Sequence, residues 1–258
     1  ELLETDYCDF VCIGEGEETF GQLIQVFSAG GDLAEVNGLA YRNQQGKFLQ
    51  NAPRALVNDV DSIPFPAYHL LDLDRYVQAE SARYPPKYPR AIQIFTSRGC
   101  PWRCTYCHTL FGKQFRPRSP ENVLAEMKML YHDYQIQEFM VEDDIFNFDL
   151  ERAKRICDLI IEEGLEVGLQ FGNGVRLERF DEELIQKLAA AGTHQMALAI
   201  ESASPRLQSD MKKYLKLHMV KDVVRWAKKY KIVTTGFFMI GFPGETLEEM
   251  KMTIRFAC

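Results

Sequence analysis

The feature that most constrains the fold is a regular alternation of apolar runs and helical segments after residue 90. The apolar runs are short and have strand character, and amphipathic segments of helix length separate them. Strands that alternate with helices in this way form parallel sheets. We therefore expect an α/β fold with a parallel sheet, either barrel-like or doubly wound. The expected strands are residues 91–97, 136–142, 166–172, 194–201 and 232–241.

Capping residues mark where the intervening helices begin. A serine before proline places an N-cap and a favourable first helical residue side by side. A threonine followed three positions later by glutamate forms a capping-box pattern. Aspartate in front of an apolar-periodic segment is a third start signal. The expected starts are Ser119 before Pro120, Asp149, Asp181, the beginning of residues 219–230, and Thr246 with Glu249.

The first 80 residues have a different organisation. Residues 10–27 have the pattern of a strand, a glycine turn and a helix, and a hairpin turn is expected near Gly46. We interpret residues 1–50 as the C-terminal remnant of an open α/β, Rossmann-like domain. Residues 51–89 are then a proline-containing connector, and residues 90–258 are the main domain.

Composition and charge exclude several function classes. The net charge of −7 is uneven, since residues 1–80 hold 14 acidic and 4 basic residues. The sequence has no basic stripe of the kind that binds nucleic acid, and it has no apolar run as long as a membrane span. The chain starts at Glu1 with no visible signal peptide and stops at Cys258 inside an expected helix, so we expect a cytoplasmic protein and a fragment of a longer one. An odd, clustered set of seven cysteines argues against a disulfide framework.

Each expected strand ends in polar or glycine residues. In parallel barrels the chemistry lies at the carboxyl ends of the strands, so all these residues would meet on one edge. Taken singly, each has an ordinary structural interpretation as a loop, cap or turn residue. The candidates are Arg98-Gly99-Cys100, Glu142-Asp143-Asp144, Asn173 with Arg176, Glu201-Ser202, and the segment from Gly241 to Glu245.

Three thiols follow the first of these strands. Cys100, Cys104 and Cys107 have the spacing C-x3-C-x2-C, and local thiolates of this kind hold an iron–sulfur cluster or zinc. A structural zinc site is closed by four ligands, and a second C-x2-C pair is absent. Three protein ligands leave one position open, which favours a catalytic cluster.

The remaining cysteines and one alternative motif need separate interpretations. Cys104 to His108 also matches a c-type haem attachment motif, but no export route is visible and Cys100 would have no role. Cys8 and Cys12 share one strand face, and Cys157 lies on the apolar face of a helix. We expect these last three to be buried thiols.

At this point the sequence resembles the radical S-adenosylmethionine (SAM) superfamily over residues 90–258. The segments that carry the resemblance are "SRGCPWRCTYC", "VEDDIF", "GNGVR", "IES" and "GFPGET", in the family's order. With "GKQFRPRSPENV", "GEGEETF" and "DVDSIPFPAYHLLD", the set is similar to the cobalamin-dependent branch. The resemblance implies a partial (β/α) TIM-like barrel of the radical SAM type, cut before its sixth strand, after the tail of a cobalamin-binding domain.

The resemblance also implies cofactors and site residues. The three cysteines would hold three irons of a [4Fe–4S] cluster, and SAM would chelate the fourth. One electron would then cleave SAM to a 5′-deoxyadenosyl radical, or cobalamin would relay a methyl group to an unidentified small-molecule or lipid-like substrate. A flavodoxin- or ferredoxin-type reductant is expected. The implied SAM-binding residues are Glu142, Asp143 and Asp144 for the amino group, Arg176 and Ser202 near the carboxylate, Glu201 near the ribose, Tyr106 and Gly241 near the adenine, and Asn173 as a further contact.

A second function class stays open at the level of the sequence. A non-catalytic iron–sulfur electron carrier would also use clustered cysteines. It predicts a fourth protein ligand and no binding of SAM. The polar strand ends favour the enzyme, because an electron carrier has no need of them.

Overall fold

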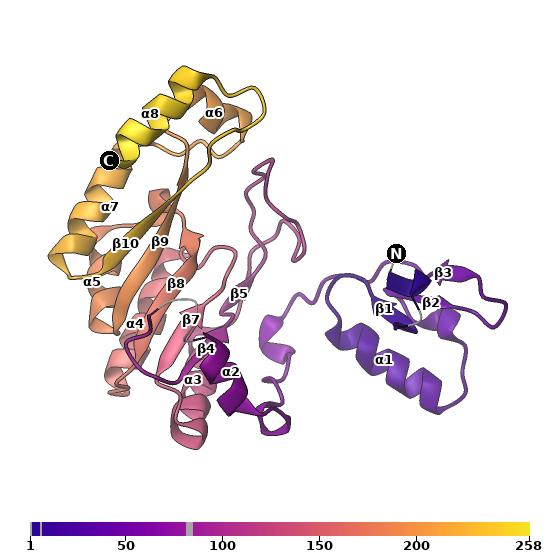
Figure 1. Ribbon diagram of the computed structural model, residues 1–258. Coiled ribbons are helices and arrows are strands. Elements are labelled where there is room, and N and C mark those ends of the chain that lie inside the picture. Colours follow the sequence, from indigo (N-terminus) through magenta and orange to yellow (C-terminus); the bar gives the residue numbers. More distant parts are fainter. Residues whose placement is uncertain (1, 6, 81–84) are drawn as a thin grey trace.

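A five-stranded parallel sheet organises residues 91–258 of the computed structural model, which describes residues 2–5, 7–80 and 85–258. Residues 81–84 of the predicted connector lie outside the described residues. The sheet order is β10-β9-β8-β7-β4, and every neighbouring pair is parallel. All five predicted strands are confirmed (Figure 1). They are β4 (Ala91–Ile94), β7 (Glu138–Val141), β8 (Gly168–Val175), β9 (Thr193–Glu201) and β10 (Val233–Phe238).

The helices begin where the capping residues predicted. Ser119, Asp149 and Asp181 each accept a backbone hydrogen bond at the start of a helix, and Thr246 forms the complete capping box with Glu249. One short helix escaped prediction, although Ser204 before Pro205 repeats the pattern of Ser119 and Pro120. The helices are α3 (Pro120–Tyr134), α4 (Leu150–Glu162), α5 (Glu182–Ala190), α6 (Pro205–Asp210), α7 (His218–Lys229) and α8 (Leu247–Ala257).

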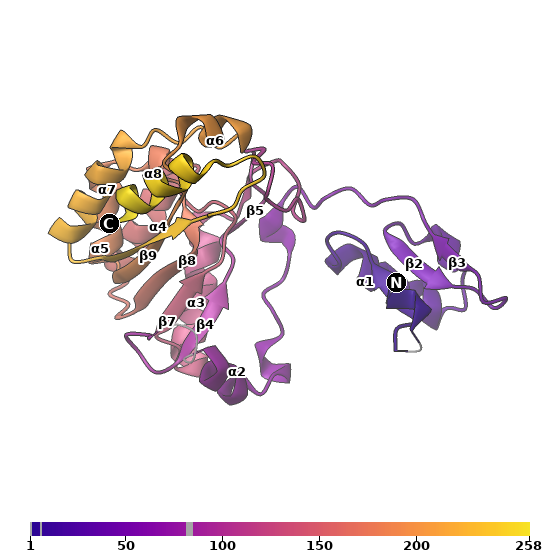
Figure 2. The ribbon, with the colours of Figure 1, turned by 45° about the horizontal axis from the view of Figure 1, so that its top comes forward.

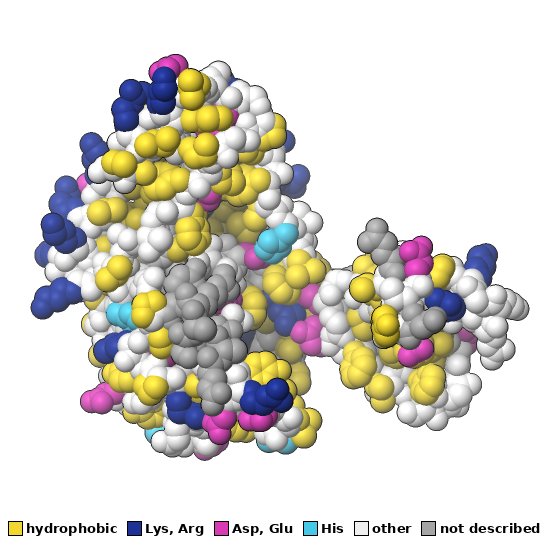
Figure 3. All heavy atoms as spheres, in the orientation of Figure 1, with side chains coloured by type: hydrophobic (Ala, Val, Ile, Leu, Met, Phe, Trp, Pro, Cys, Tyr) yellow, Lys and Arg dark blue, Asp and Glu magenta, His cyan; other side chains and the backbone are white. Residues whose placement is uncertain are grey.

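The main core lies between these helices and the sheet. Fully buried side chains such as Phe139, Leu184 and Leu198 fill it, and Cys157 on α4 belongs to it as predicted. Figure 2 shows the helices along one side of a curved, open sheet, as in a partial barrel. At the β10 edge of the sheet, apolar side chains of β10 and α8 remain exposed (Figure 3). The sixth strand of the predicted barrel stays a prediction.

The first predicted strand is divided in the structure. After β4 the chain turns at Phe95 and Thr96 and forms β5 (Ser97–Arg98), which pairs antiparallel with β6 (Arg116–Pro117). Ser97 lies opposite Pro117, and Arg98 lies opposite Arg116. This short ladder closes the base of residues 99–115, which we call the cysteine loop.

Residues 7–58 form a small N-terminal unit apart from the barrel (Figure 1). Its sheet has the order β1-β2-β3 and is antiparallel, with the predicted hairpin turning at Gly46. Among the described residues, the buried core cluster of this unit consists of Leu23, Val36, Leu39 and Tyr41. The Rossmann-like origin and the three domain ranges stay predictions. The elements are β1 (Phe10–Cys12), α1 (Glu17–Ser28), β2 (Leu39–Arg42) and β3 (Phe48–Gln50).

Two cysteines of this unit differ from their prediction. Cys8 and Cys12 are partly exposed, so the prediction that they are buried thiols is wrong. β1 begins only at Phe10 and lies at the edge of its sheet, and the small unit packs too little around it to enclose these side chains.

The connector and the short helices complete the fold. Within residues 59–80 the chain forms one α-helix and two 3₁₀ turns that lie beside β4 and α3. No helix among the described residues combines the length and the apolar character needed to cross a bilayer. The remaining elements are α2 (Leu73–Glu80) and the 3₁₀ helices Leu2–Glu4, Leu33–Glu35, Val60–Ser62, Tyr68–Leu70 and Leu177–Arg179.

Candidate active site at the carboxyl ends of the strands

The carboxyl ends of the parallel strands meet at one edge of the sheet, as predicted. The side chain of Asn173, near the carboxyl end of β8, donates at 2.8 Å to the backbone carbonyl of Glu142, which follows β7. Arg176 Nη1 lies 3.9 Å from the Sγ atom of Cys104 in the cysteine loop. Met239 N donates to the Glu201 carbonyl at 2.8 Å and so joins the ends of β10 and β9. Residues from all five strand ends therefore belong to one region.

The three thiols of the cysteine loop are free and differ in exposure. Cys100 and Cys104 are partly buried, whereas Cys107 is exposed. Burial raises the pKa of Cys100, and the negative charges of Cys107 and Asp144 raise it further. Burial also raises the pKa of Cys107, which the cation of Lys113 opposes. The thiols therefore influence one another electrostatically, as neighbouring groups do.

The donor set fits an iron–sulfur cluster. Three thiols on one loop are soft ligands of the kind that iron clusters use. Cations lie near two of them, since Lys113 and Lys213 both oppose the rise in the pKa of Cys107, and Arg176 Nη1 lies 3.9 Å from Cys104 Sγ. Positive charge favours the thiolate forms that ligation requires. Among the described residues, no three Cys, His, Asp or Glu side chains are grouped closely enough to hold a single metal ion.

Arg176 lies behind the cysteine loop and is almost fully buried. Its guanidinium stacks 3.8 Å from the ring centroid of Trp102, which lies between two of the cysteines. It also forms an ion pair with Glu178 at 3.1 Å and donates to the Lys213 carbonyl. The sequence predicted Arg176 but not Trp102 or Glu178. Three buried polar atoms, Trp102 Nε1, Arg176 Nε and Glu178 Oε2, have no hydrogen-bond partner in this structure.

A buried lysine that the sequence analysis missed links two predicted residues. Lys213 Nζ lies 3.0 Å from Glu201 Oε1 and 3.2 Å from the Tyr106 hydroxyl. Burial raises the pKa of Tyr106, and the charge of Glu201 raises it further, so this phenol stays protonated. Glu201 has φ 68°, a left-handed conformation that is uncommon outside glycine and marks a constrained site. No motif in the sequence identifies Lys213.

The three acidic residues after β7 have different surroundings. The Asp143 carboxylate is buried and accepts hydrogen bonds from Thr96 N at 2.6 Å, Thr96 Oγ1 at 2.5 Å and Ser97 Oγ at 2.5 Å. Burial raises its pKa, and the hydrogen bonds from Ser97 and Thr96 oppose that shift. Asp144 instead lies 3.3 Å from His108 Nε2, next to Cys107. Asp143 therefore faces the turn before the cysteine loop, and Asp144 faces the loop itself.

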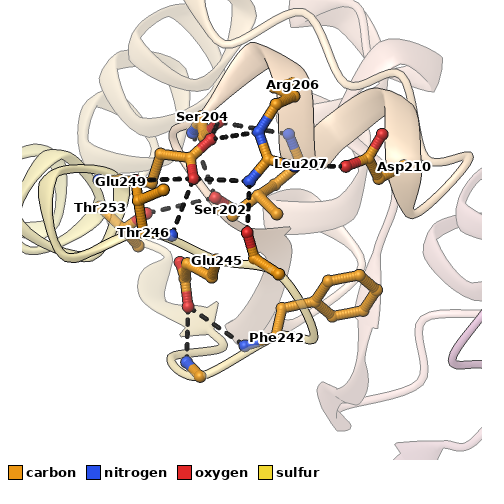
Figure 4. A network of polar contacts seen from close by, with 12 residues as sticks. Ser202, Ser204, Arg206, Leu207, Asp210, Phe242, Glu245, Thr246, Glu249 and Thr253 are labelled. Carbon is orange, nitrogen blue, oxygen red and sulfur yellow. Dashed lines mark hydrogen bonds and ion pairs between the residues drawn. The ribbon is translucent and has the colours of Figure 1, made fainter.

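Ser202 is fully buried in a polar network between α6 and α8 (Figure 4). Its hydroxyl lies 3.2 Å from Thr253 Oγ1 and accepts from Ser204 N at 3.1 Å. In the same network, Arg206 pairs with Glu249 at 2.6 Å and donates to the Gly244 carbonyl at 2.8 Å. The structure thus gives Ser202 a supporting position and not an open one.

The predicted adenine neighbourhood is brought together. Gly241 has φ 87°, and its N–H donates to Glu245 Oε2 at 2.5 Å, which fixes the turn after β10. A cleft of about 820 Å³ lies between this turn and the cysteine loop. Its lining includes Thr105, Tyr106, Phe238, Ile240 and Gly241. Residues far apart in sequence thus form one concave surface beside the thiols.

The sequence also matches a family model. The model of the radical SAM superfamily matches residues 94–257, which hold the parallel sheet and the cysteine loop. The chain belongs to the radical SAM superfamily. The resemblance stated from the sequence is therefore confirmed, and so is the α/β fold of a partial TIM-like barrel.

Curated relatives include methyltransferases. An uncharacterized methyltransferase of Pyrococcus horikoshii is 37% identical over 99% of this chain and 54% of that protein. The cytidylyl-2-hydroxyethylphosphonate methyltransferase of Streptomyces wedmorensis is 31% identical over 99% of this chain and 53% of that protein. The chain spans about half the length of these relatives.

Solved structures share the fold at low identity. The radical SAM methyltransferase TsrM of Kitasatospora setae, with tryptophan substrate and a SAM analog bound, gives a TM-score of 0.79 at 22% identity and covers 96% of this chain and 48% of that chain. The cobalamin-dependent SAM radical enzyme OxsB, with aqua-cobalamin bound, gives a TM-score of 0.77 at 22% identity, over 96% and 36%. The likeness covers the N-terminal unit as well as the barrel.

Proposed function

We propose that the full-length protein is a radical SAM enzyme of the cobalamin-dependent class that transfers a methyl group or rearranges its substrate. The observation that supports this most directly is the cysteine loop beside an 820 Å³ cleft, within a chain of the radical SAM superfamily. Cys100, Cys104 and Cys107 would hold a [4Fe–4S] cluster. When bound, the cluster supplies the electron that cleaves SAM.

The residues of this chain would bind and orient SAM beside the cluster. Tyr106 and Gly241 line the cleft that would take the adenine. Glu201, paired with Lys213, would lie near the ribose. These two groups also offer a carboxylate and an ammonium to the hydroxyls of a nucleoside, so the site has both hydrogen-bond acceptors and donors.

The amino and carboxylate groups of SAM would lie near the ends of β7 and β8. Asp144 faces the loop at His108, and Asn173 fixes the backbone of Glu142. We assign positioning roles to Asp143, Arg176 and Ser202. Asp143 orients the turn before the loop, Arg176 supports Cys104, and Ser202 holds α8 against the end of β9 through Thr253.

Cobalamin is proposed as a second cofactor of the full-length protein. Two curated relatives are methyltransferases, and the similar structure of OxsB has aqua-cobalamin bound. The 258 residues contain no D-x-H-x2-G motif to supply a cobalt-ligating histidine. Because the N-terminal unit offers only one strand–turn–helix of the expected domain, the 258-residue chain alone should retain little hydroxocobalamin on gel filtration.

The non-catalytic electron carrier finds no support in the comparisons. The curated relatives are described as methyltransferases, methylthiotransferases and cyclases.

An external one-electron reductant of the flavodoxin or ferredoxin type is proposed to supply electrons in the cytoplasm. The substrate is proposed to be a small or lipid-like molecule that contacts parts of the full-length protein.

The test is anaerobic cluster reconstitution of the full-length protein, followed by reduction in the presence of SAM. We expect about four irons per chain, an EPR spectrum of the reduced cluster that changes on adding SAM, and release of 5′-deoxyadenosine or methyl transfer when cobalamin is supplied. Zinc without iron, or a cluster whose EPR spectrum is indifferent to SAM, would contradict the proposal. A covalent haem absorbance would favour the c-type alternative.

A further inference from the structure

A carboxylate from the N-terminal unit lies buried at the base of the cysteine loop. The two oxygens of Glu15 accept hydrogen bonds from Arg116 Nη2 at 2.7 Å and Nη1 at 2.9 Å, a bidentate pair. Arg98 Nη1 approaches the same carboxylate at 3.2 Å, and the Val57 N–H donates to it at 2.9 Å. Although burial acts to raise the pKa of Glu15, these partners hold it below its usual value.

The two arginines form an arrangement that needs an acid. Arg98 and Arg116 lie directly opposite each other in the β5–β6 ladder, and like charges in such a pair repel. The side chain of Arg116 is only 2% exposed. A buried guanidinium without a carboxylate partner is strongly unfavourable. Glu15 therefore compensates a charge conflict that the ladder creates at both ends of the cysteine loop.

The same arginine reaches the interior of the loop and the end of the N-terminal unit. Arg116 donates to the carbonyl of Phe111 within the cysteine loop at 2.9 Å and to the carbonyl of Val57 at 2.5 Å. Arg98 lies 5.5 Å from the Phe111 ring centroid, at the distance of a cation–π contact. One guanidinium thus bridges three segments of the chain.

The loop is folded tightly where these contacts hold it. Gly99 has φ 76°, and a Cβ atom there would lie 2.3 Å from the Gln114 carbonyl oxygen. A Cβ atom on Gly112 would lie 2.5 Å from a methyl carbon of Leu56. The beginning and the end of the loop are therefore in close contact, and Cys100 follows directly from that contact. A displacement of the base would be passed to Cys100.

We propose that Glu15 is a positioning residue that holds the cysteine loop through Arg98 and Arg116, so that the N-terminal unit and the iron–sulfur site are coupled. The inference rests on the proposed function, because that function gives the cysteine loop its role of holding the iron–sulfur cluster. In Figure 3, acidic and basic side chains lie together at the narrow junction between the two parts of the molecule. Glu17 joins the group only through Arg98, at 2.5 Å, and is 37% exposed.

The experiment measures thiol accessibility in the full-length, metal-free protein under anaerobic conditions. Iodoacetamide labelling rates of Cys100 and Cys157 are followed by mass spectrometry in the wild type, in Glu15→Gln and in Glu17→Gln. Cys157 lies in the barrel core and reports general unfolding. We expect the ratio of the Cys100 rate to the Cys157 rate to rise about tenfold in Glu15→Gln, and by less than about twofold in Glu17→Gln.

The ratio decides the outcome even if the variant is unstable. General unfolding exposes both cysteines, so an unchanged ratio in Glu15→Gln would overturn the proposal, as would equal effects of the two substitutions. In a double-mutant cycle with Arg116→Met, we expect the Glu15→Gln effect to shrink by most of its size, because the two residues act as a pair. Fully additive effects would also overturn it.

Failure of the proposed function would be seen separately. The labelling ratio needs neither iron nor SAM. A wild type that shows no SAM-dependent chemistry would end the proposed function and leave the loop-positioning role intact. In the loaded enzyme, Glu15→Gln should in addition change the EPR spectrum of the reduced cluster, whereas Glu17→Gln should leave it as in the wild type.

Discussion

The N-terminal unit and the parallel-sheet region contain similar elements but are held in different ways. The parallel sheet packs on five helices longer than eight residues and buries a large apolar core that includes Phe139 and Leu184. The N-terminal unit has one helix and four core side chains. Its apolar residues Phe20, Ile24 and Phe27 remain exposed along α1. A small core stabilises little, so polar contacts such as those of Glu15 decide where the unit lies.

The buried acids of the two regions show the same contrast. At the amino end of the sheet, Glu138 is fully buried and accepts from Gln170 at 2.7 Å, with His194 at 2.6 Å. These partners come from adjacent strands, so this cluster binds the sheet to itself. Glu15 instead joins elements of two regions. Similar chemistry therefore stabilises one region internally and connects the other to it.

The largest effect is expected from cysteines, which occur in both regions. Cys104→Ala should remove most of the bound iron after anaerobic reconstitution, because it deletes one of the three proposed protein ligands. Cys12→Ala in the N-terminal unit should leave the iron content within about 20% of the wild type, since Cys12 ends β1 and lies outside the cysteine loop. Iron and acid-labile sulfide analysis measures both. Equal losses would show that the two regions share the ligands.

A core truncation in the barrel should have the next largest effect. Leu184 is fully buried on α5, and Leu184→Ala should lower the free energy of unfolding by about 2–5 kcal/mol. Urea denaturation followed by circular dichroism measures the loss. A cost below about 1 kcal/mol would mean that the barrel core repacks far more easily than its density suggests.

The sequence predicted those parts of the fold that are encoded locally. Each strand has its own apolar run, and the N-cap residues Ser119, Asp149 and Asp181 mark the starts of their helices. The short helix α6 was missed because six residues are too few for a periodic pattern. The division of the first strand after Ile94 also has no local signal, since the pairing partner of Arg98 is far along the chain.

The site could be predicted only where spacing carries the chemistry. The three cysteines are close in sequence, so their shared role is visible there. Glu15 and Arg116 are 101 positions apart, and only the path of the chain brings them together. Lys213 could not be predicted either, because its neighbours in the sequence do not distinguish it from a surface lysine. For Asp143 and Ser202 the sequence located the region, whereas burial determined which way each side chain turns.

A core truncation in the N-terminal unit should lower the free energy of unfolding of the barrel less than Leu184→Ala does. Leu39 is as fully buried as Leu184, but its core is small and separate. Leu39→Ala should change the unfolding free energy of the barrel by less than about 1 kcal/mol, because distant sites act independently. Hydrogen exchange should show faster amide exchange in residues 39–42 and unchanged exchange in β8 and β9. Equal destabilisation by the two substitutions would show that the molecule unfolds as one unit.

The smallest effect on stability is expected from removing one helix cap in each region. Asp149 accepts the N–H of Arg152 at 3.0 Å and caps α4, whereas Asp32 accepts the N–H of Ala34 at 2.9 Å and caps a three-residue 3₁₀ helix. Asp149→Ala should cost about 1 kcal/mol in global unfolding, because α4 belongs to the barrel core. Asp32→Ala removes an equivalent hydrogen bond from a turn that the barrel does not need, so the urea midpoint should stay at the wild-type value. If Asp32→Ala lowers that midpoint as much as Asp149→Ala does, the N-terminal unit unfolds together with the barrel. The polar junction at Glu15 would then transmit stability as well as position.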